Sequence, residues 1–167
     1  MKNRIILVLI TILFSGTYVY SQSQNYKDSL INELNNTKHD TSKIKILLPL
    51  AFTYAKEDST TFFSYIEEIK SISEKHNFEK GIGLYYTALG YYYKNEHAIE
   101  ALSYFEQAIE PLQNSNSLQD LLRVYNWIGS IYMNIGSYNL SIEYNFKSIE
   151  ICEKFGDNRL IATTYTN

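Results

Sequence analysis

Residues that commonly perform chemistry are few in this sequence, and their spacing does not group them. The three histidines, His39, His76 and His97, fall in or beside predicted turns, and none has a second histidine or a cysteine at the spacing of a metal site. Glu67 and Glu68 are expected to be a solvated pair on a helix surface. A metal site would need unrelated residues to converge, so we expect the histidines to be solvated turn residues and expect no cofactor.

Nucleophilic catalysis has no clear candidate either. Cys152 is the only cysteine, so no disulfide can form within the chain, and its place in a helical pattern predicts a small buried side chain. A reactive thiol is the alternative for this residue. The sequence has no glycine-rich phosphate loop, no nucleophile elbow and no kinase motif. We expect a protein that is not an enzyme. An enzyme that acts in the cell envelope is the least favoured hypothesis.

Composition predicts a folded, all-α protein. The 167 residues are 45% hydrophobic and 20% charged, which is typical of a globular domain. Seven glycines and two prolines are too few for a fold of short strands and tight turns, whereas long stretches without such residues suit helices.

The first 21 residues resemble a secretory signal peptide. Lys2 and Arg4 precede a largely apolar run from Ile5 to Phe14, and a small residue, Ser21, follows at the expected cleavage site. Residues 1–21 are therefore expected to direct export to the periplasm or the outside of the cell. The alternative is an uncleaved leader that anchors the chain in the inner membrane, although the run is short for a spanning helix.

The charge of the chain argues against nucleic acid as a partner. Removal of the leader leaves 13 basic residues against 18 acidic ones, a net charge of −5. Proteins that bind nucleic acid carry a basic face instead. Contact with a membrane is expected only through an uncleaved leader or through a segment missing downstream.

The sequence repeats at an interval of 39 or 40 residues, which predicts a tandem-repeat fold. The recurring positions are Tyr86, Leu89, Gly90 and Tyr93, then Tyr125, Ile128, Gly129 and Tyr132, and less clearly Leu47, Leu50, Ala51 and Tyr54. A second series is Phe62, Ile66 and Ile69, then Ala101, Phe105 and Ala108, then Ser141, Asn145 and Ser148. The segments that begin at Ile72 and Ile151 also align without gaps.

Each repeat is predicted to be a pair of helices. The expected helices are Thr41 to Lys56, Thr60 to His76, Glu79 to Asn95, Ala98 to Gln113, Leu118 to Ile135 and Tyr138 to Phe155. Residues 22–41 form a linker with a short helix from Tyr26 to Asn35, and the repeat domain spans 42–167. Gly136 suits a left-handed helix end, and Ser117 with Asp120 is close to a capping box. From Asp157 a fourth, truncated unit begins.

These residues resemble the tetratricopeptide repeat family. Its pattern has an aromatic residue, Leu-Gly and Tyr in the first helix and Ala and an aromatic residue in the second. The matching residues are Tyr86, Leu89, Gly90, Tyr93, Ala101 and Phe105. The resemblance implies a right-handed α-solenoid that binds proteins or peptides. The long period is similar to that of repeats in bacterial signalling and regulatory proteins.

The glycines and tyrosines are expected to be scaffold residues. Gly90 and Gly129 would let a large neighbouring ring lie against the backbone, and Tyr86, Tyr93, Tyr125 and Tyr132 would fill the space between helices. The resemblance places the first helix of every pair on a concave face that binds extended peptides or helices.

Helical spacing selects a candidate groove on that face. Its members are Lys45 and Phe52 in the first unit, Thr87, Tyr91 and Lys94 in the second, and Arg123, Asn126, Ser130 and Asn134 in the third. The asparagines could hold a peptide backbone, and Lys94 or Arg123 a carboxylate. The alternative is an ordinary solvated face.

Two functions follow. The first is an exported, noncatalytic module whose groove binds a protein or peptide. The second is the N-terminal sensory region of a truncated bacterial sensor kinase or transcriptional regulator, which is implied by the resemblance alone. The chain stops inside its fourth unit, so we expect either a truncated piece of a longer protein or self-association through the uncapped C-terminal end.

Overall fold

The computed structural model describes residues 24–155, which are helical and contain no strand. A first helix over residues 24–36 is followed by six more. These are α2 (Asp40–Tyr54), α3 (Ser59–Lys75), α4 (Glu79–Tyr93), α5 (Ala98–Asn114), α6 (Leu118–Asn134) and α7 (Tyr138–Phe155). The prediction of an all-α protein is confirmed. The expected leader, 1–21, and the start of the fourth unit lie outside the described residues.

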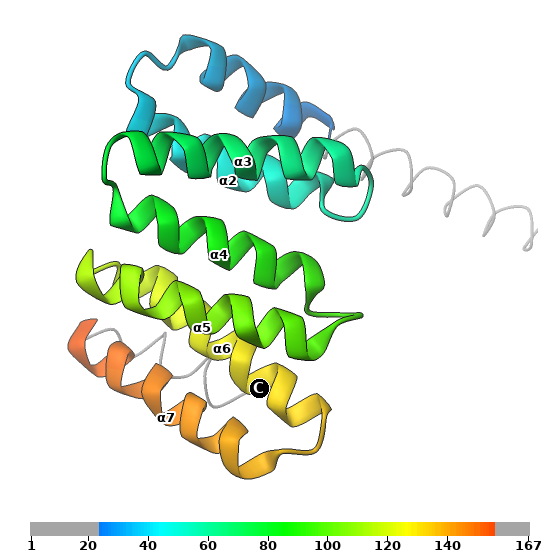
Figure 1. Ribbon diagram of the computed structural model, residues 1–167, viewed down its shortest axis with the longest axis vertical. Coiled ribbons are helices and arrows are strands. Elements are labelled where there is room, and N and C mark those ends of the chain that lie inside the picture. The colour runs from blue at the N-terminus through cyan, green and yellow to red at the C-terminus, as the bar shows by residue number, and fades with distance from the viewer. Residues whose placement is uncertain (1–23, 156–167) are drawn as a thin grey trace, which may run out of the picture.

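The helices form consecutive hairpins, arranged in chain order along the long axis of the molecule (Figure 1). The most extensive contacts lie within the pairs α2 with α3, α4 with α5 and α6 with α7. Smaller contacts join each hairpin to the next, α3 to α4 and α5 to α6, and α2 also touches α4. The helix ends differ from the predicted ends by at most two residues.

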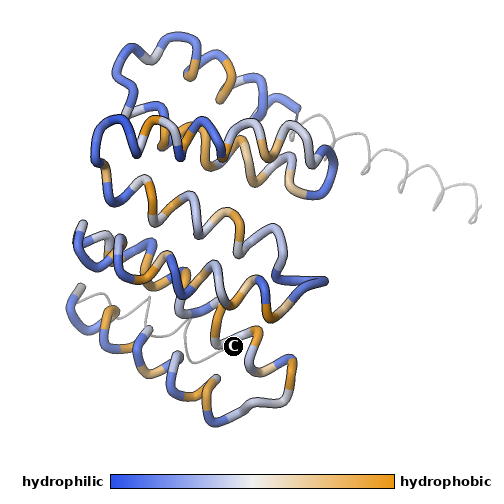
Figure 2. The backbone as a smooth tube through the Cα atoms, viewed as in Figure 1, coloured by the Kyte–Doolittle hydropathy of each residue, from blue (hydrophilic) through white to orange (hydrophobic). Residues whose placement is uncertain are grey.

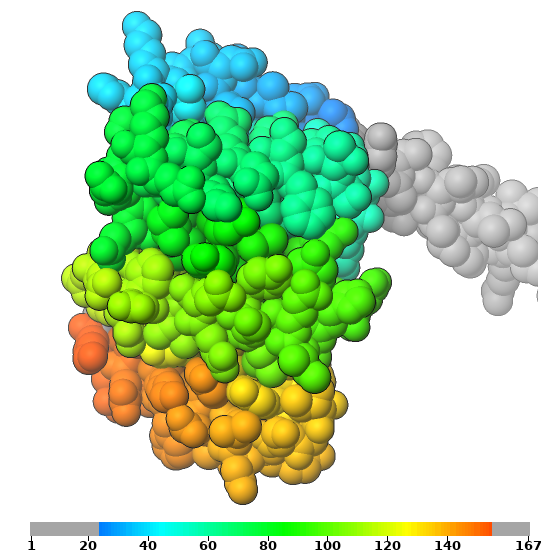
Figure 3. Space-filling model, in the orientation of Figure 1, coloured from blue at the N-terminus to red at the C-terminus, as the bar shows by residue number. Residues whose placement is uncertain are grey.

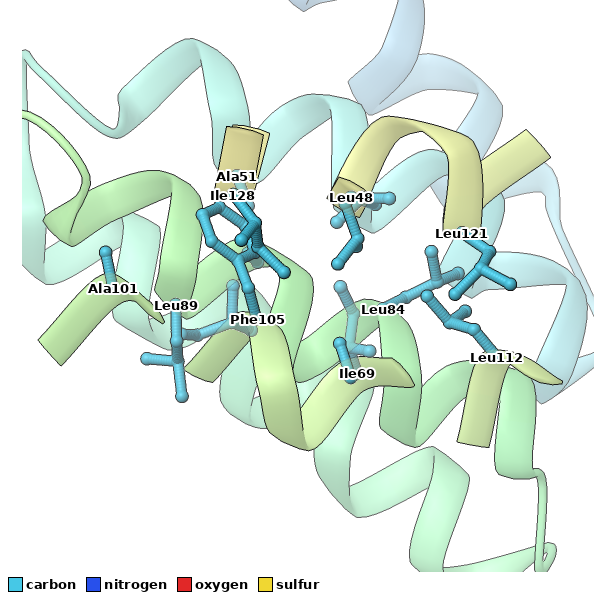
Figure 4. Close-up of a cluster of buried hydrophobic side chains, with 14 of the residues drawn as sticks. Leu48, Ala51, Ile69, Leu84, Leu89, Ala101, Phe105, Leu112, Leu121 and Ile128 are labelled. Atoms are coloured by element: carbon cyan, nitrogen blue, oxygen red, sulfur yellow. The ribbon is translucent and has the colours of Figure 1, made fainter. Parts of the chain in front are cut away.

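One hydrophobic core runs through α2 to α7 (Figure 4). Its largest fully buried side chains include Phe62 on α3, Phe105 on α5 and Ile128 on α6. Along the chain, hydrophobic residues recur within the helices and polar residues gather at the turns (Figure 2). The hydrophobic residues that recur within each helix allow one face of that helix to be buried against its neighbours.

The helix over residues 24–36 covers the outer side of the first hairpin. Its Leu30 forms a second, smaller cluster with Ile46 and Leu50 of α2. Lys27 is 6% exposed, pairs with Glu57, and lies 4.7 Å from the centre of the Tyr54 ring.

None of the helices within residues 24–155 is both long and apolar enough to cross a membrane.

Left-handed residues end three of the helices. The backbone φ is +48° at Asn77 and +52° at Asn116, which follow α3 and α5, and +80° at Gly136, which follows α6. The prediction for Gly136 is confirmed. Ser117 is the N-cap residue of α6, so the predicted start of this helix is confirmed. Its side chain makes no capping bond, however, and its hydroxyl lies 3.0 Å from that of Ser115 instead.

The two repeat glycines are buried, but they face different neighbours. A Cβ built on Gly90 would come within 2.5 Å of the Phe105 ring, so the prediction of a ring against this backbone is confirmed. At Gly129 that prediction is wrong, because the nearest atom is Oδ1 of Asn145, at 2.9 Å from a built Cβ. Asn145 occupies the position of Phe105 in the third hairpin, so an amide replaces the ring.

Candidate partner-binding hollow

The surface by which one hairpin contacts the next is apolar in the first hairpin. Leu48 of α2 and Phe62 and Ile66 of α3 are at most 7% exposed. A ring from the following helix contacts this surface, because Tyr92 of α4 stacks on Phe62 with 4.7 Å between ring centres. Burial of such side chains stabilises the contact between hairpins.

The corresponding surface of the second hairpin is also covered. The residues 39 positions further along are Thr87, Ala101 and Phe105, and all three are fully buried. The indole of Trp127, on α6, lies 5.4 Å from the ring of Phe105. A helix of the third hairpin therefore covers the second, as α4 covers the first.

In the third hairpin the same positions are polar. They are occupied by Asn126 of α6 and by Ser141 and Asn145 of α7. α7 forms one end of the described molecule (Figure 3), and within residues 24–155 no further helix covers it. Its outer side exposes Ile142 by 53%, whereas the equivalent Leu102 of the second hairpin is 8% exposed. The surface that would receive another hairpin is thus present, and among residues 24–155 it is open.

A hollow of about 790 Å³ lies at this open surface. We call it the α6/α7 hollow. Its lining residues are Lys94 of α4, Gln119, Leu122, Arg123, Asn126, Trp127, Gly129, Ser130, Met133 and Asn134 of α6, and Ser141 and Asn145 of α7. The volume is in the range of sites that hold a small ligand or several residues of a peptide.

The structure brings together five of the nine predicted groove residues. Lys94, Arg123, Asn126, Ser130 and Asn134 line the α6/α7 hollow. All but one of these come from the third unit, where no helix of the described residues covers the surface.

The other four predicted groove residues lie elsewhere. Lys45 is exposed on α2, and Phe52 and Tyr91 pack on each other with ring centres 4.5 Å apart. Thr87 is a wrong prediction, because it is fully buried and its hydroxyl donates to the carbonyl of Gly83 at 2.7 Å. This burial depends on packing between helices, which helical spacing within one unit could not reveal.

Sequence reasoning missed Trp127, which forms one wall of the hollow. Its ring lies 5.3 Å from that of Tyr91 and 6.3 Å from that of Phe52, so three helices contribute to one aromatic cluster. The ammonium of Lys94 lies 4.9 Å from the Tyr91 ring and 5.9 Å from the Trp127 ring, within cation–π range. The available signal was the position of the only tryptophan, next to the predicted Asn126.

The lining of the hollow is positive. Among the described residues it contains two cations, Lys94 and Arg123, and no carboxylate. Arg123 is partly neutralised by Asp120, whose Oδ1 lies 3.4 Å from its Nη1, and Asp120 also pairs with Lys80 at 3.0 Å. Burial, and then the charge of Lys56, lower the pKa of Lys94. An anionic group in the hollow would favour the charged form of Lys94 and so oppose this lowering of its pKa.

One polar atom in the hollow has no partner. The hydroxyl of Ser141 is buried and makes no hydrogen bond, and it is the one such side-chain atom found within residues 24–155. A buried polar group without a partner costs about 1 to 3 kcal/mol. The amide of Asn145 lies in the same hollow. A ligand that offers hydrogen bonds could satisfy both side chains.

Metal binding finds no support in the described part of the chain. Within residues 24–155, no group of three or more histidine, cysteine and carboxylate side chains is placed to hold a metal ion. His76 instead lies 3.2 Å from Asp40 at the surface.

No protein-family model matches the chain, and no curated protein sequence matches it.

Proposed function

We propose that this protein is a noncatalytic interaction module and that the α6/α7 hollow binds an acidic segment of a partner protein. The hairpins resemble tetratricopeptide repeats, and we propose that they form a right-handed α-solenoid whose open end is the binding surface. The signal-like residues 1–21 suggest that it works after export.

The observation that supports this function is the change in chemistry at one repeated surface. Where the first hairpin has Leu48, Phe62 and Ile66, the third has Asn126, Ser141 and Asn145. Apolar residues there suit a neighbouring helix, because they bury area. Amides and hydroxyls suit an extended backbone, since they pair with its N–H and C=O groups.

The charge of the hollow favours one kind of partner segment over another. The chain as a whole carries a net charge of −3, yet the described part of the hollow's lining includes Lys94 and Arg123 and no carboxylate. An aspartate or glutamate of the partner would form charge-assisted hydrogen bonds with these side chains, and Arg123 could bind a carboxylate with two nitrogens. A basic segment would be repelled.

Peptide selection tests the proposal. A displayed library of random peptides is selected on the immobilised full chain, and the enriched peptides are titrated in solution while the emission of Trp127, the only tryptophan, is followed. Acidic peptides that change this emission are expected. Enriched peptides without an excess of acidic residues, or binding that leaves the Trp127 emission unchanged, would overturn the assignment of the hollow.

A further inference from the structure

We propose that the acidic segment of the partner carries a tyrosine whose ring packs on Asn145 inside the α6/α7 hollow. We call this place, which Gly129, Ser141 and Asn145 line, the ring site. The ring site deepens the proposed function and rests on it, because it adds a second side chain by which the hollow selects its partner.

Each covered hairpin has a phenylalanine at one of the two positions that correspond to Ser141 and Asn145. These are Phe62 in α3, which corresponds to Ser141, and Phe105 in α5, which corresponds to Asn145. Both phenylalanine rings are fully buried. In α7 neither position has a ring, so a hydroxyl and an amide form the floor of the ring site.

The helix that covers each of these hairpins supplies a second ring at the same place. Tyr92 of α4 stacks on Phe62, with 4.7 Å between the ring centres and 18° between the ring planes. Trp127 of α6 lies on Phe105, with 5.4 Å between the centres and 30° between the planes. Such ring pairs attract each other in addition to the apolar area that they bury. Twice, therefore, this surface receives a flat ring with a polar edge from the element that covers it.

The ring site has the space for such a ring, because it opens into the hollow. Gly129 has no side chain there, and the atom nearest to a Cβ built on it is Oδ1 of Asn145, at 2.9 Å. The amide of Asn145 is flat. A ring from the partner can therefore lie on Asn145 as Trp127 lies on Phe105.

Two polar groups of the ring site favour tyrosine over other apolar or aromatic residues. Ser141 is 1% exposed, and its hydroxyl has no hydrogen-bond partner within residues 24–155. Asn145 stands one turn further along α7, and its amide both donates and accepts. The hydroxyl of a tyrosine also donates and accepts, so it can pair with either group. A phenylalanine or leucine would leave both unpaired, and the N–H of a tryptophan only donates.

The position of Arg123 sets the distance between the tyrosine and an acidic residue of the partner. Arg123 stands six residues before Gly129 on α6, which is about 9 Å along the helix axis. An extended segment advances about 3.3 Å per residue, so about three residues span this distance. The segment should therefore have an aspartate or glutamate within about four residues of its tyrosine.

Selection of peptides on the full chain gives the first test. The probe is the displayed library of random peptides, and the enriched acidic peptides are expected to carry a tyrosine within about four residues of an acidic residue. In the strongest binder, replacing this tyrosine by phenylalanine should weaken binding about three- to tenfold, and replacing it by leucine at least about tenfold. Acidic peptides that carry tryptophan, phenylalanine or aliphatic residues in place of tyrosine would overturn the ring site.

A double-mutant cycle shows where the tyrosine hydroxyl binds. In the variant Ser141→Ala/Asn145→Leu, the tyrosine and phenylalanine forms of the peptide should bind within about twofold of each other, because both polar partners are gone. The matched control is Ser130→Ala/Asn134→Leu, which makes the same changes one turn apart on α6, in the same hollow. Here the preference for tyrosine should remain about three- to tenfold, whatever the change in overall affinity. A preference that persists in the first variant, or disappears in the control, would overturn the ring site.

The ring site and the proposed function fail in different ways. Peptides that carry the tyrosine but no excess of acidic residues would contradict the acidic selectivity of the hollow and leave the ring site in place. Acidic peptides that bind equally well with leucine in place of tyrosine would leave the proposed function in place and remove the ring site. A library that yields no binding peptide would contradict both.

Discussion

The ring of Phe105 lies directly on the backbone of Gly90, so that α4 and α5 approach more closely than any residue with a side chain would allow. A Cβ on Gly90 would come within 2.5 Å of two ring carbons, and Phe105 is fully buried. A glycine inside a helix costs roughly 1 kcal/mol relative to alanine. The close approach offsets this cost, because it lets a whole ring pack in the core.

Gly90→Ala should therefore destabilise the protein. The clash with a rigid ring costs roughly 1 to 3 kcal/mol and offsets the gain of roughly 1 kcal/mol in helix propensity, so we expect a net loss of up to about 2 kcal/mol in the free energy of unfolding. Urea unfolding followed by circular dichroism measures it. The matched control is Gly129→Ala, where the one contact under 3.0 Å of a built Cβ is with the end of the flexible Asn145 side chain. An equal loss in both variants would contradict this account of Gly90.

Ser141→Ala should make the protein more stable and a worse binder. The change removes a buried hydroxyl that has no partner, so the free energy of unfolding should rise by about 1 kcal/mol. The control is Ser148→Ala, where the hydroxyl donates to the carbonyl of Tyr144 at 3.2 Å, so its removal should not stabilise. Stability is measured by urea unfolding and affinity by peptide titration. A less stable Ser141→Ala variant would show that the hydroxyl has a partner inside the protein.

Asp40 makes stability depend on pH in the acid range. Hydrogen bonds from Lys75 and then His76 lower the pKa of Asp40 from 3.8 to about 2. Because the pKa is lower in the folded state, the contribution of Asp40 is present above the unfolded pKa and is lost as the pH falls from about 4 to about 2. The variant Asp40→Asn should lack this part of the loss of stability at low pH. A difference between the urea midpoints of wild type and variant that stays constant from about pH 6 to about pH 2 would contradict the ion pair.

The helices were predictable because their signals are local. Few glycines and prolines, a 39-residue period and apolar spacing sufficed to place every described helix within two residues of its observed ends. The packing of Phe105 on Gly90 also followed, since a helical glycine indicates close approach.

The site was only half predictable, because burial between hairpins is not a local property. Thr87 and Asn126 occupy the same place in successive units, and helical spacing assigns both to one exposed face. Packing between helices buries Thr87, whereas Asn126 lines a hollow. Trp127 was missed for the same reason, since its contacts with Phe52 and Tyr91 cross three helices.

Charge reversal in the hollow tests the central claim that it binds acidic segments. Lys94→Glu and Arg123→Glu replace the two cations of the lining, and Lys45→Glu makes the same change at an exposed lysine of α2 outside the hollow. Each reversal exchanges an attraction for a repulsion of similar size, and loss of one charged hydrogen bond costs about 1.5 to 3 kcal/mol.

The decisive measurement is the affinity of one selected acidic peptide for these variants and for the wild type, at low and at physiological salt. The account predicts a loss of at least about tenfold for Lys94→Glu and for Arg123→Glu, a larger effect at low salt, and no change for Lys45→Glu. Equal affinities across all three variants and the wild type would contradict it.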